Sequence, residues 1–327
     1  MSKQESIRVR KVGAMHVIEV SGLHKQYGAV TAVQDVSFSV ERGEIFGILG
    51  PNGAGKTTTV ECISGLRTGD RGTVRVLGFD PAVDGEQLRQ VVGVQLQEAG
   101  LPDRLKVREA LEVFAAFYRK TADIDTLLDR LGLTEKADTA YKKLSGGQKQ
   151  RLAIAIALIG DPQVVILDEL TTGLDPHARR EVWELVEQIR ADSVTVLLVT
   201  HFMEEAERLC DRVALIDRGS VVALDTPAGV TQRAGGGQRM RFRPSAPVAD
   251  EDLRALPSVT SVSRHGAQIE IEGGQDLIQQ VTSLLAHRQI IAAELRIEQR
   301  TLDDAFLALT TDAQAPDNSP TNQRNGA

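Results

Sequence analysis

The chain has 327 residues, of which 42% are apolar and 25% charged, values that are ordinary for globular proteins. The formal net charge of −7 argues against nucleic acid as the main partner. Cys62 and Cys210 match no metal or redox spacing and favour a reduced, cytoplasmic setting. No signal peptide is visible, and no apolar run approaches the ~18–20 residues of a membrane span. We therefore expect any membrane to be reached only through another chain.

The stretch that organises the chain is a glycine-rich loop at residues 50–58, which fits the phosphate-binding pattern G-x-x-x-x-G-K-[ST]. An apolar run at 44–49 predicts a strand before it, and Thr57 to Leu66 predicts a helix after it. Glycines let the backbone wrap a phosphate, and a helix N-terminus offers free N–H groups to an anion. Lys56 would contact the β- and γ-phosphates, and the Thr57 hydroxyl would bind Mg²⁺. The nucleotide-binding residues predicted here are Gly50, Pro51, Asn52, Gly53, Ala54, Gly55, Lys56, Thr57 and Thr58. The alternative is a turn without a ligand.

Two carboxylates end a second apolar run, at 164–169, which has the pattern of a buried parallel strand. Ligands of α/β sheets bind at the carboxyl ends of such strands. Asp168 would hold Mg²⁺, and Glu169 would act as general base toward the attacking water. His201 ends the next apolar run in the same way, although a lone histidine there is more often structural.

Three further features are weaker on their own. Gln97 lies at the end of the strand predicted at 92–98, which runs into a polar turn. It could place its amide oxygen on Mg²⁺ or on water, or could be a solvated loop residue. Tyr27 could stack on an adenine base or pack on the small sheet. Ser145 and Gln148 form a capping box, which predicts a helix start and also a second anion site.

Taken together, these motifs resemble the nucleotide-binding subunit of an ABC transporter over residues 15–228. The signature LSGGQ at 144–148 is the element specific to that family. The resemblance also places Gln97 at the Q-loop, Gly173-Leu174-Asp175 at the D-loop and His201 at the switch histidine. It implies the catalytic residues Lys56, Glu169 and His201 and the Mg²⁺ ligands Thr57, Gln97 and Asp168. It adds to the nucleotide-binding residues Tyr27, Gln97, Ser145, Gly146, Gly147, Gln148, Asp168 and Asp175.

The family implies that two cassettes dimerise head to tail around two ATP molecules. Ser145, Gly146 and Gly147 of one copy would contact the γ-phosphate held by the loop of the other, and hydrolysis would open the dimer. Two positions depart from the pattern. Leu170 replaces a proline after the catalytic glutamate, and Ile156 replaces an arginine in the helix that follows the signature. Neither removes a catalytic group.

The expected fold class is α/β. It comprises a phosphate-loop cassette with a RecA-like core, a small antiparallel β subdomain and a helical subdomain, followed by a smaller α+β domain. The order βαββαβ in that last domain predicts a ferredoxin-like fold. The end of this domain, at residues 301–307, resembles that of cassettes of the daunorubicin/multidrug-resistance export branch. We expect the domain to regulate the protein or to stabilise a dimer. The expected segments are a tail at 1–14, the cassette at 15–228 with its helical subdomain at 99–150, a linker at 229–237, the C-terminal domain at 238–311 and a disordered tail at 312–327.

The expected function is an ATPase subunit, bound to the cytoplasmic face of the cell membrane, that exports a drug-like or lipidic substrate. Its partners would be a separate permease and a second copy of itself, with no nucleic acid. The alternative is a soluble ABC ATPase that acts on the ribosome or DNA. An ATP-gated scaffold without hydrolysis is disfavoured because Glu169 and His201 are both present.

Overall fold

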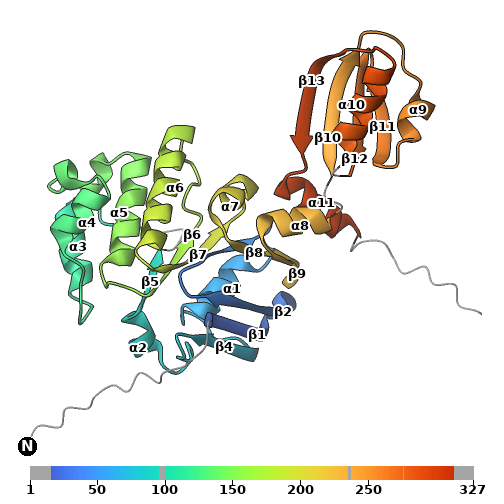
Figure 1. The fold of residues 1–327 in the computed structure, drawn as a ribbon. Coiled ribbons are helices and arrows are strands. Elements are labelled where there is room, and N and C mark those ends of the chain that lie inside the picture. Colours follow the sequence, from blue (N-terminus) through green and yellow to red (C-terminus); the bar gives the residue numbers. More distant parts are fainter. Residues whose placement is uncertain (1–15, 96–99, 235–236, 275, 313–327) are drawn as a thin grey trace, which may run out of the picture. The chain divides into compact units, whose positions relative to one another are not determined.

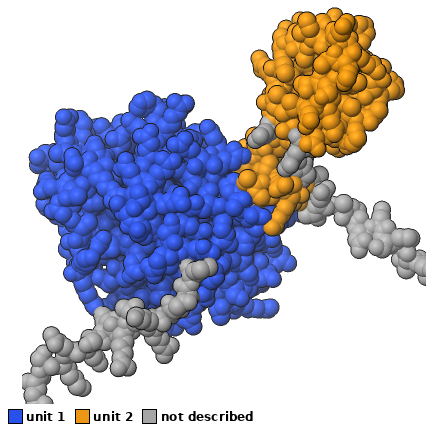
Figure 2. Space-filling view, viewed as in Figure 1, with its two compact units in different colours: residues 1–227 blue, residues 228–327 orange. Residues whose placement is uncertain are grey.

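The computed structural model describes residues 16–95, 100–234, 237–274 and 276–312. By its internal contacts the chain divides into two compact units, residues 1–227 and 228–327 (Figure 1, Figure 2). Gln97 and nearly all of the two expected tails lie outside the described residues.

The first unit is built on a nine-stranded sheet. Its strands are β1 (His16–Tyr27), β2 (Val30–Glu41), β3 (Ile45–Leu49), β4 (Arg71–Val76), β5 (Val92–Gln95), β6 (Val164–Asp168), β7 (Thr195–Thr200), β8 (Arg212–Asp217) and β9 (Ser220–Asp225). The order across the sheet is β4-β1-β2-β9-β8-β3-β7-β6-β5. Strands β8, β3, β7, β6 and β5 are parallel, and every residue of β3, β6 and β7 is buried. Because these strands are covered on both faces, their sequences are near-continuous apolar runs.

The parallel pairing brings the carboxyl ends of these strands to one edge of the sheet. The loop at 50–55 follows β3, Glu169 follows β6, and His201 follows β7. On the other side, β1 pairs antiparallel with β2 and β4, which confirms the predicted antiparallel β subdomain. The predicted α/β core is therefore confirmed, and these three predicted segments lie at the edge where α/β sheets generally bind ligands.

Helices complete this unit. They are α1 (Lys56–Ile63), α2 (Gly85–Arg89), α3 (Val107–Ala115), α4 (Ile124–Arg130), α5 (Gly146–Leu158), α6 (Pro176–Ala191) and α7 (Met203–Leu209), with short 3₁₀ turns η1 (Thr134–Lys136) and η2 (Tyr141–Lys143). Helices α3 and α4 lie within the segment 99–150 that was expected to be helical, and α5 begins at the end of that segment. Helix α5 packs on α3 and α6 (Figure 1). Helix α1 ends earlier than predicted, because Gly65 adopts φ +75° and a Cβ there would lie 2.8 Å from Pro81 O.

The second unit has the predicted βαββαβ order. Its elements are α8 (Pro227–Arg233), β10 (Gln238–Pro244), α9 (Asp250–Arg254), β11 (Val259–His265), β12 (Gln268–Gly273), α10 (Leu277–His287), β13 (Ala292–Gln299) and α11 (Leu302–Asp312). The four strands form an antiparallel sheet in the order β11-β12-β10-β13. Buried side chains of β10, β12 and α10, including Met240, Phe242 and Val281, form its core. Helix α8 occupies the first part of the segment where a linker was expected.

Candidate functional site

The loop between β3 and α1 has a backbone that only glycine can adopt at two points. Gly50 has φ +154° and Gly55 has φ +102°. A Cβ on Gly50 would lie 2.1 Å from Ile216 O, and one on Gly55 would lie 2.3 Å from Ala32 O. Both glycines are thus fixed by close backbone approach as well as by φ. The loop can therefore pack in this way, just before α1, only if glycine occupies both positions.

Lys56 lies at the centre of this loop. Its Nζ donates to Gly50 O at 2.8 Å and to Pro51 O at 3.0 Å, and its side chain is buried. Burial lowers the pKa of Lys56, whereas the nearby charges of Glu169 and Asp168 act in the opposite direction. The lysine is held as a desolvated cation beside two acids, where a phosphate could replace the loop carbonyls as its partner. Thr57, next in the chain, is exposed in the first turn of α1.

Asp168 is the buried acid at the end of β6. Its exposed fraction is 2%, and burial together with the adjacent charge of Glu169 raises its pKa to about 6, against the opposing effect of Lys56. A buried carboxylate whose charge is so disfavoured would be stabilised by a cation. Oxygen ligands of this kind, with the exposed Thr57 hydroxyl, suit Mg²⁺, which keeps several waters and a few protein ligands. The residues present therefore fit a magnesium ion.

Glu169 has a backbone conformation that is unusual for its residue type. Its φ is +51°, and its N–H donates to Val199 O at 2.8 Å across to β7. A non-glycine residue in this region is strained by roughly 1–3 kcal/mol, and such residues concentrate at functional sites. The turn aims the carboxylate at the end of β7. There, Glu169 Oε1 lies 3.3 Å from His201 Nδ1, and Thr172 Oγ1 lies 3.4 Å from Glu169 Oε2.

The pair formed by Glu169 and His201 is open to solvent on the histidine side. The His201 side chain is 30% exposed, whereas that of Glu169 is 11% exposed. The His201 ring packs on Phe202, with 4.0 Å between the ring centroids. A carboxylate that is nearly buried, with a histidine at its open side, can accept a proton from a water bound at this edge of the sheet.

Two buried polar residues at this edge were not predicted. Gln95 is the last residue of β5, and its Oε1 accepts from Asp168 N at 3.1 Å. Glu205 of α7 is fully buried, and its Oε1 accepts from Trp183 Nε1 at 3.1 Å. Burial raises the pKa of Glu205, against the opposing effect of its hydrogen bonds. A polar residue inside an otherwise apolar strand or helix face is the one signal that could have identified them.

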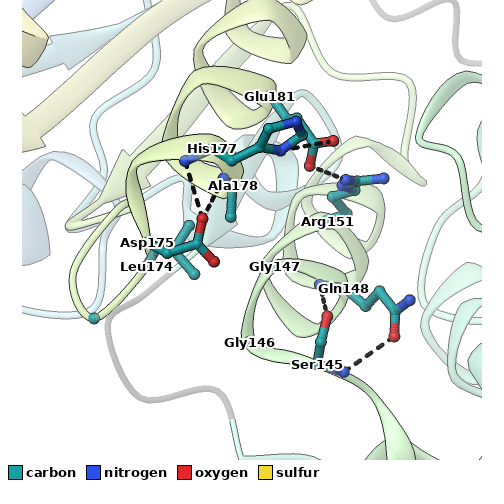
Figure 3. Close-up of a pocket in the computed structure, with 11 residues that line it drawn as sticks. Ser145, Gly146, Gly147, Gln148, Arg151, Leu174, Asp175, His177, Ala178 and Glu181 are labelled. Carbon is teal, nitrogen blue, oxygen red and sulfur yellow. Dashed lines mark hydrogen bonds and ion pairs between the residues drawn. The ribbon is translucent and has the colours of Figure 1, made fainter.

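The signature segment forms a separate pocket of about 450 Å³ (Figure 3). The predicted capping box is confirmed, because Ser145 N donates to Gln148 Oε1 at 3.0 Å and Gln148 N donates to Ser145 Oγ at 3.3 Å. The pocket is lined by Ser145, Gly146, Gly147, Gln148, Arg151, Gly173, Leu174, Asp175, His177, Ala178 and Glu181. The structure therefore brings the signature and D-loop segments together, and no phosphate-loop residue lines this pocket.

The other wall of the pocket is the start of α6. Asp175 caps that helix, with Oδ1 accepting from His177 N at 2.9 Å and Ala178 N at 3.0 Å. These N–H donors lower the pKa of Asp175. Glu181 pairs with Arg151 of α5 and lies 3.4 Å from His177 Nδ1 (Figure 3). Two helix N-termini thus face one pocket, and an anion would be favoured there.

Tyr27 ends β1 with 39% of its surface exposed, so it is not part of the sheet's core. The Arg67 guanidinium lies 5.1 Å from its ring centroid, and Lys25 Nζ lies 5.8 Å from it. Such cation–π contacts hold a ring in place and leave part of its surface to a ligand.

Two positions depart from the family's sequence pattern, Leu170 and Ile156. Leu170 is fully buried and Ile156 is partly buried. Both are packing residues in this structure.

Comparison with known proteins gives a consistent result. Residues 33–172 match the family model described as ABC transporter. The Nod factor export ATP-binding protein I of Mesorhizobium japonicum is 38% identical over 304 residues, which cover 90% of this chain and 86% of that protein. The linearmycin resistance ATP-binding protein LnrL of Bacillus subtilis is 34% identical over 309 residues, covering 90% of this chain and 98% of that protein.

Solved structures of ABC transporter cassettes match about two thirds of this chain. The structure of an ATP-binding subunit of an ABC transporter matches with a TM-score of 0.61 and 31% identity, covering 67% of this chain and 93% of that one. A dimeric bacterial ABC transporter cassette matches with a TM-score of 0.57 and 26% identity, covering 64% of this chain and 98% of that one. No helix among the described residues is long and apolar enough to cross a membrane.

Proposed function

The chain belongs to the ATP-binding subunits of ABC transporters of the export type, and we propose that two copies of it close around two ATP molecules to drive export through a separate permease. It is an ATPase by its family. One observation carries the dimeric site. The phosphate loop and the signature pocket lie in one chain, yet no residue of that loop lines the pocket. A second copy would supply the missing half of each site.

In this proposal Lys56 leaves the loop carbonyls and binds the β- and γ-phosphates. The backbone N–H groups of residues 50 and 52–58 surround the same phosphates, and the partly exposed Tyr27 ring stacks on the adenine base. Thr57 and Asp168 would hold Mg²⁺, with Gln97 as a third ligand. The ion would offset the charge of the phosphate oxygens.

Glu169 is then the general base. Its carboxylate accepts a proton from the attacking water, and His201, 3.3 Å away, contacts the γ-phosphate and orients the base. The donors at the start of α5 in the second copy, at Ser145, Gly146 and Gly147, complete the phosphate contacts, with Gln148 capping that helix. Asp175, beside the signature in the same pocket, couples the two sites across the dimer.

We further propose that the substrate is drug-like or lipidic and that the protein sits on the cytoplasmic face of the membrane through its permease. The names of the relatives, which refer to Nod factor export and linearmycin resistance, support export. They do not favour the alternative of an ATPase that works on the ribosome or DNA.

The permease can be identified directly. Tagged Glu169→Gln protein is expressed in its native host, purified from detergent-solubilised membranes with ATP present, and analysed by mass spectrometry. Lys56→Ala protein, processed in parallel, shows which partners depend on nucleotide. A multi-span membrane protein at near-equal stoichiometry is the expected result. Ribosomal or DNA-repair proteins without any permease would contradict the proposal.

A further inference from the structure

Strand β13 forms one edge of the C-terminal sheet, beside β10 (Figure 1). Within the described residues no strand pairs with its other side. Leu295 and Ile297 of this strand are 42% and 45% exposed, although both are large apolar residues. The opposite edge, β11, carries polar residues such as Ser261 and Ser263 at its exposed positions. An exposed apolar edge strand presents unpaired backbone groups with which a further strand can pair. Of the two edges of this sheet, β13 is therefore the one better suited to such pairing.

The backbone groups that β13 offers can be assigned from its ladder with β10. Arg300 N donates to Gly237 O at 3.2 Å, one step beyond the aligned pair of residues 238 and 299. In an antiparallel ladder the residues that bond to the neighbour alternate with residues that turn away from it. Residues 296 and 298 therefore bond toward β10, while Leu295 and Ile297 present their N–H and C=O groups at the free edge.

A bulge limits the length of this free edge. Glu294 has φ +53°, and the register between β10 and β13 shifts between Arg241 and Arg243. The Glu294 carboxylate also pairs with Arg243 of its own sheet at 3.3 Å. The regular part of β13 thus covers residues 295–299. An identical strand that pairs antiparallel with all five of these residues has its two-fold axis at Ile297.

The charges of β13 fit this register. With Ile297 opposite itself, Arg296 of each copy lies opposite Glu298 of the other, which gives two complementary pairs on one face. Neither residue forms an ion pair with the described part of its own chain. On the other face the two Ile297 side chains meet. Moving the two-fold axis by one residue, to Arg296, slides one strand by two residues past the other. It would place Arg296 against Arg296 and Glu294 against Glu298, which like charges disfavour.

We propose that two copies of this chain pair through β13, centred on Ile297, and so join two four-stranded sheets into one. This inference rests on the proposed cassette dimer and extends it to the C-terminal domain. A contact of five residues per strand is far below the ~1,200 Å² of a stable interface, so it is weak by itself. Tethering by two closed cassettes raises the effective concentration of the strands to roughly the millimolar range, and the pairing forms then.

Cross-linking tests this pairing in the full chain. Residues directly opposite in a hydrogen-bonded pair have Cα atoms about 5.5 Å apart, which suits a disulfide. Ile297→Cys in the Glu169→Gln background, mildly oxidised with ATP, should form a covalent dimer. The native Cys62 and Cys210 are buried and should not interfere. Ser263→Cys, exposed on the opposite edge, is the matched control and should stay monomeric on denaturing gels.

Charge reversal supplies the second arm. Arg296→Glu should lower the cross-linked fraction of Ile297→Cys at least several-fold, and adding Glu298→Arg should restore it. A molar mass showing an ATP-bound dimer without any Ile297→Cys disulfide would overturn the strand pairing while leaving the proposed function intact. Equal cross-linking of Ser263→Cys, or failure of the double reversal to restore it, would also overturn it. If ATP produces no dimer, the proposed function fails, and oxidation at high protein concentration then decides. A disulfide at Ile297→Cys there supports the pairing, and its absence rejects it.

Discussion

His201 Nδ1 lies 3.3 Å from Glu169 Oε1, although the two residues are 32 positions apart in the chain. They meet because β6 and β7 are parallel neighbours whose carboxyl ends reach the same edge of the sheet. The left-handed backbone of Glu169 turns its carboxylate toward β7. The charges of Glu169 and Asp168 also act on Lys56. In the proposed site the proton acceptor therefore lies beside the loop that would hold the phosphates.

The first prediction concerns the proton acceptor. Glu169→Gln keeps the shape of the side chain but cannot accept a proton at neutral pH. Steady-state phosphate release should fall by roughly 10²- to 10⁴-fold, as for loss of a general base, with ATP affinity nearly unchanged. Glu184→Gln, on α6, is a control that should keep the wild-type rate. Wild-type turnover by Glu169→Gln would remove Glu169 from the role.

Removing the cation of the phosphate loop should affect binding itself. Lys56→Ala takes away a buried, charge-assisted donor, which is worth about 1.5–3 kcal/mol, so affinity for ATP should drop by roughly 10- to 150-fold. Equilibrium binding of a fluorescent ATP analogue measures this. Lys120→Ala, an exposed lysine paired with Asp161, should bind like the wild type. Unchanged affinity in Lys56→Ala would mean that the loop does not hold the nucleotide.

The raised pKa of Asp168 predicts two opposite responses to pH. Between about pH 4 and pH 6 the folded chain holds a proton that the unfolded chain has lost. The free energy of unfolding without nucleotide should therefore decrease as pH rises through this window. Mg²⁺ requires the ionised form, so affinity for MgATP should increase over the same window, by up to about tenfold per pH unit.

Asp168→Asn checks both responses. The variant has no titrating group at this position, so urea unfolding at pH 4.5 and pH 7 should show a smaller difference than the wild type. Its MgATP affinity should be low and nearly independent of pH. If the wild-type profiles persist in Asp168→Asn, another group is responsible.

Ser145 caps helix α5 and, in the proposed function, contacts the γ-phosphate. A variant of another N-cap residue, outside the signature pocket, separates these two roles. Ser145→Ala removes the N-cap of α5 and should lower the free energy of unfolding by about 0.5–2 kcal/mol. It should also reduce ATPase activity. Asp123 is the N-cap of α4, and its Oδ1 accepts from Thr126 N at 2.8 Å. Asp123→Ala should therefore lower the free energy of unfolding by a similar amount. Because Asp123 lies outside the signature pocket, its variant should keep full activity, and equal losses in both would deny Ser145 a phosphate contact.

Tyr27 offers a test of base recognition. Stacking on a base is worth about 1–3 kcal/mol, so Tyr27→Ala should weaken ATP binding by roughly 5- to 150-fold, whereas Tyr27→Phe should keep it. Tyr141→Ala, which loses a ring that contacts Lys149, is the matched control. If Tyr27→Ala binds ATP as tightly as the wild type does, Tyr27 does not stack on the base.

Much of this arrangement could be predicted from the sequence because its motifs are local. The loop at 50–58 needs glycine where its backbone touches Ile216 and Ala32, and the capping box of α5 is complete within residues 145–148. The order of strands and helices in the C-terminal unit also follows from short-range periodicity.

Contacts between distant segments could not be predicted in this way. Gln95 meets Asp168 across 73 positions, and Glu205 meets Trp183 between two helices, so neither belongs to a local pattern. The free edge of β13 depends on the strand order of the whole sheet, which periodicity does not fix. Helix α8 was missed because the glycine run at 235–237, which follows it in the sequence, favours a linker there.

Light scattering on the Glu169→Gln protein shows whether two chains close around ATP. The chain mass is 35.4 kDa. With ATP present we expect about twice that mass, and we expect the single-chain mass when Lys56→Ala is added. A Glu169→Gln protein that binds ATP yet stays at the single-chain mass at all concentrations would contradict a dimer closed by ATP.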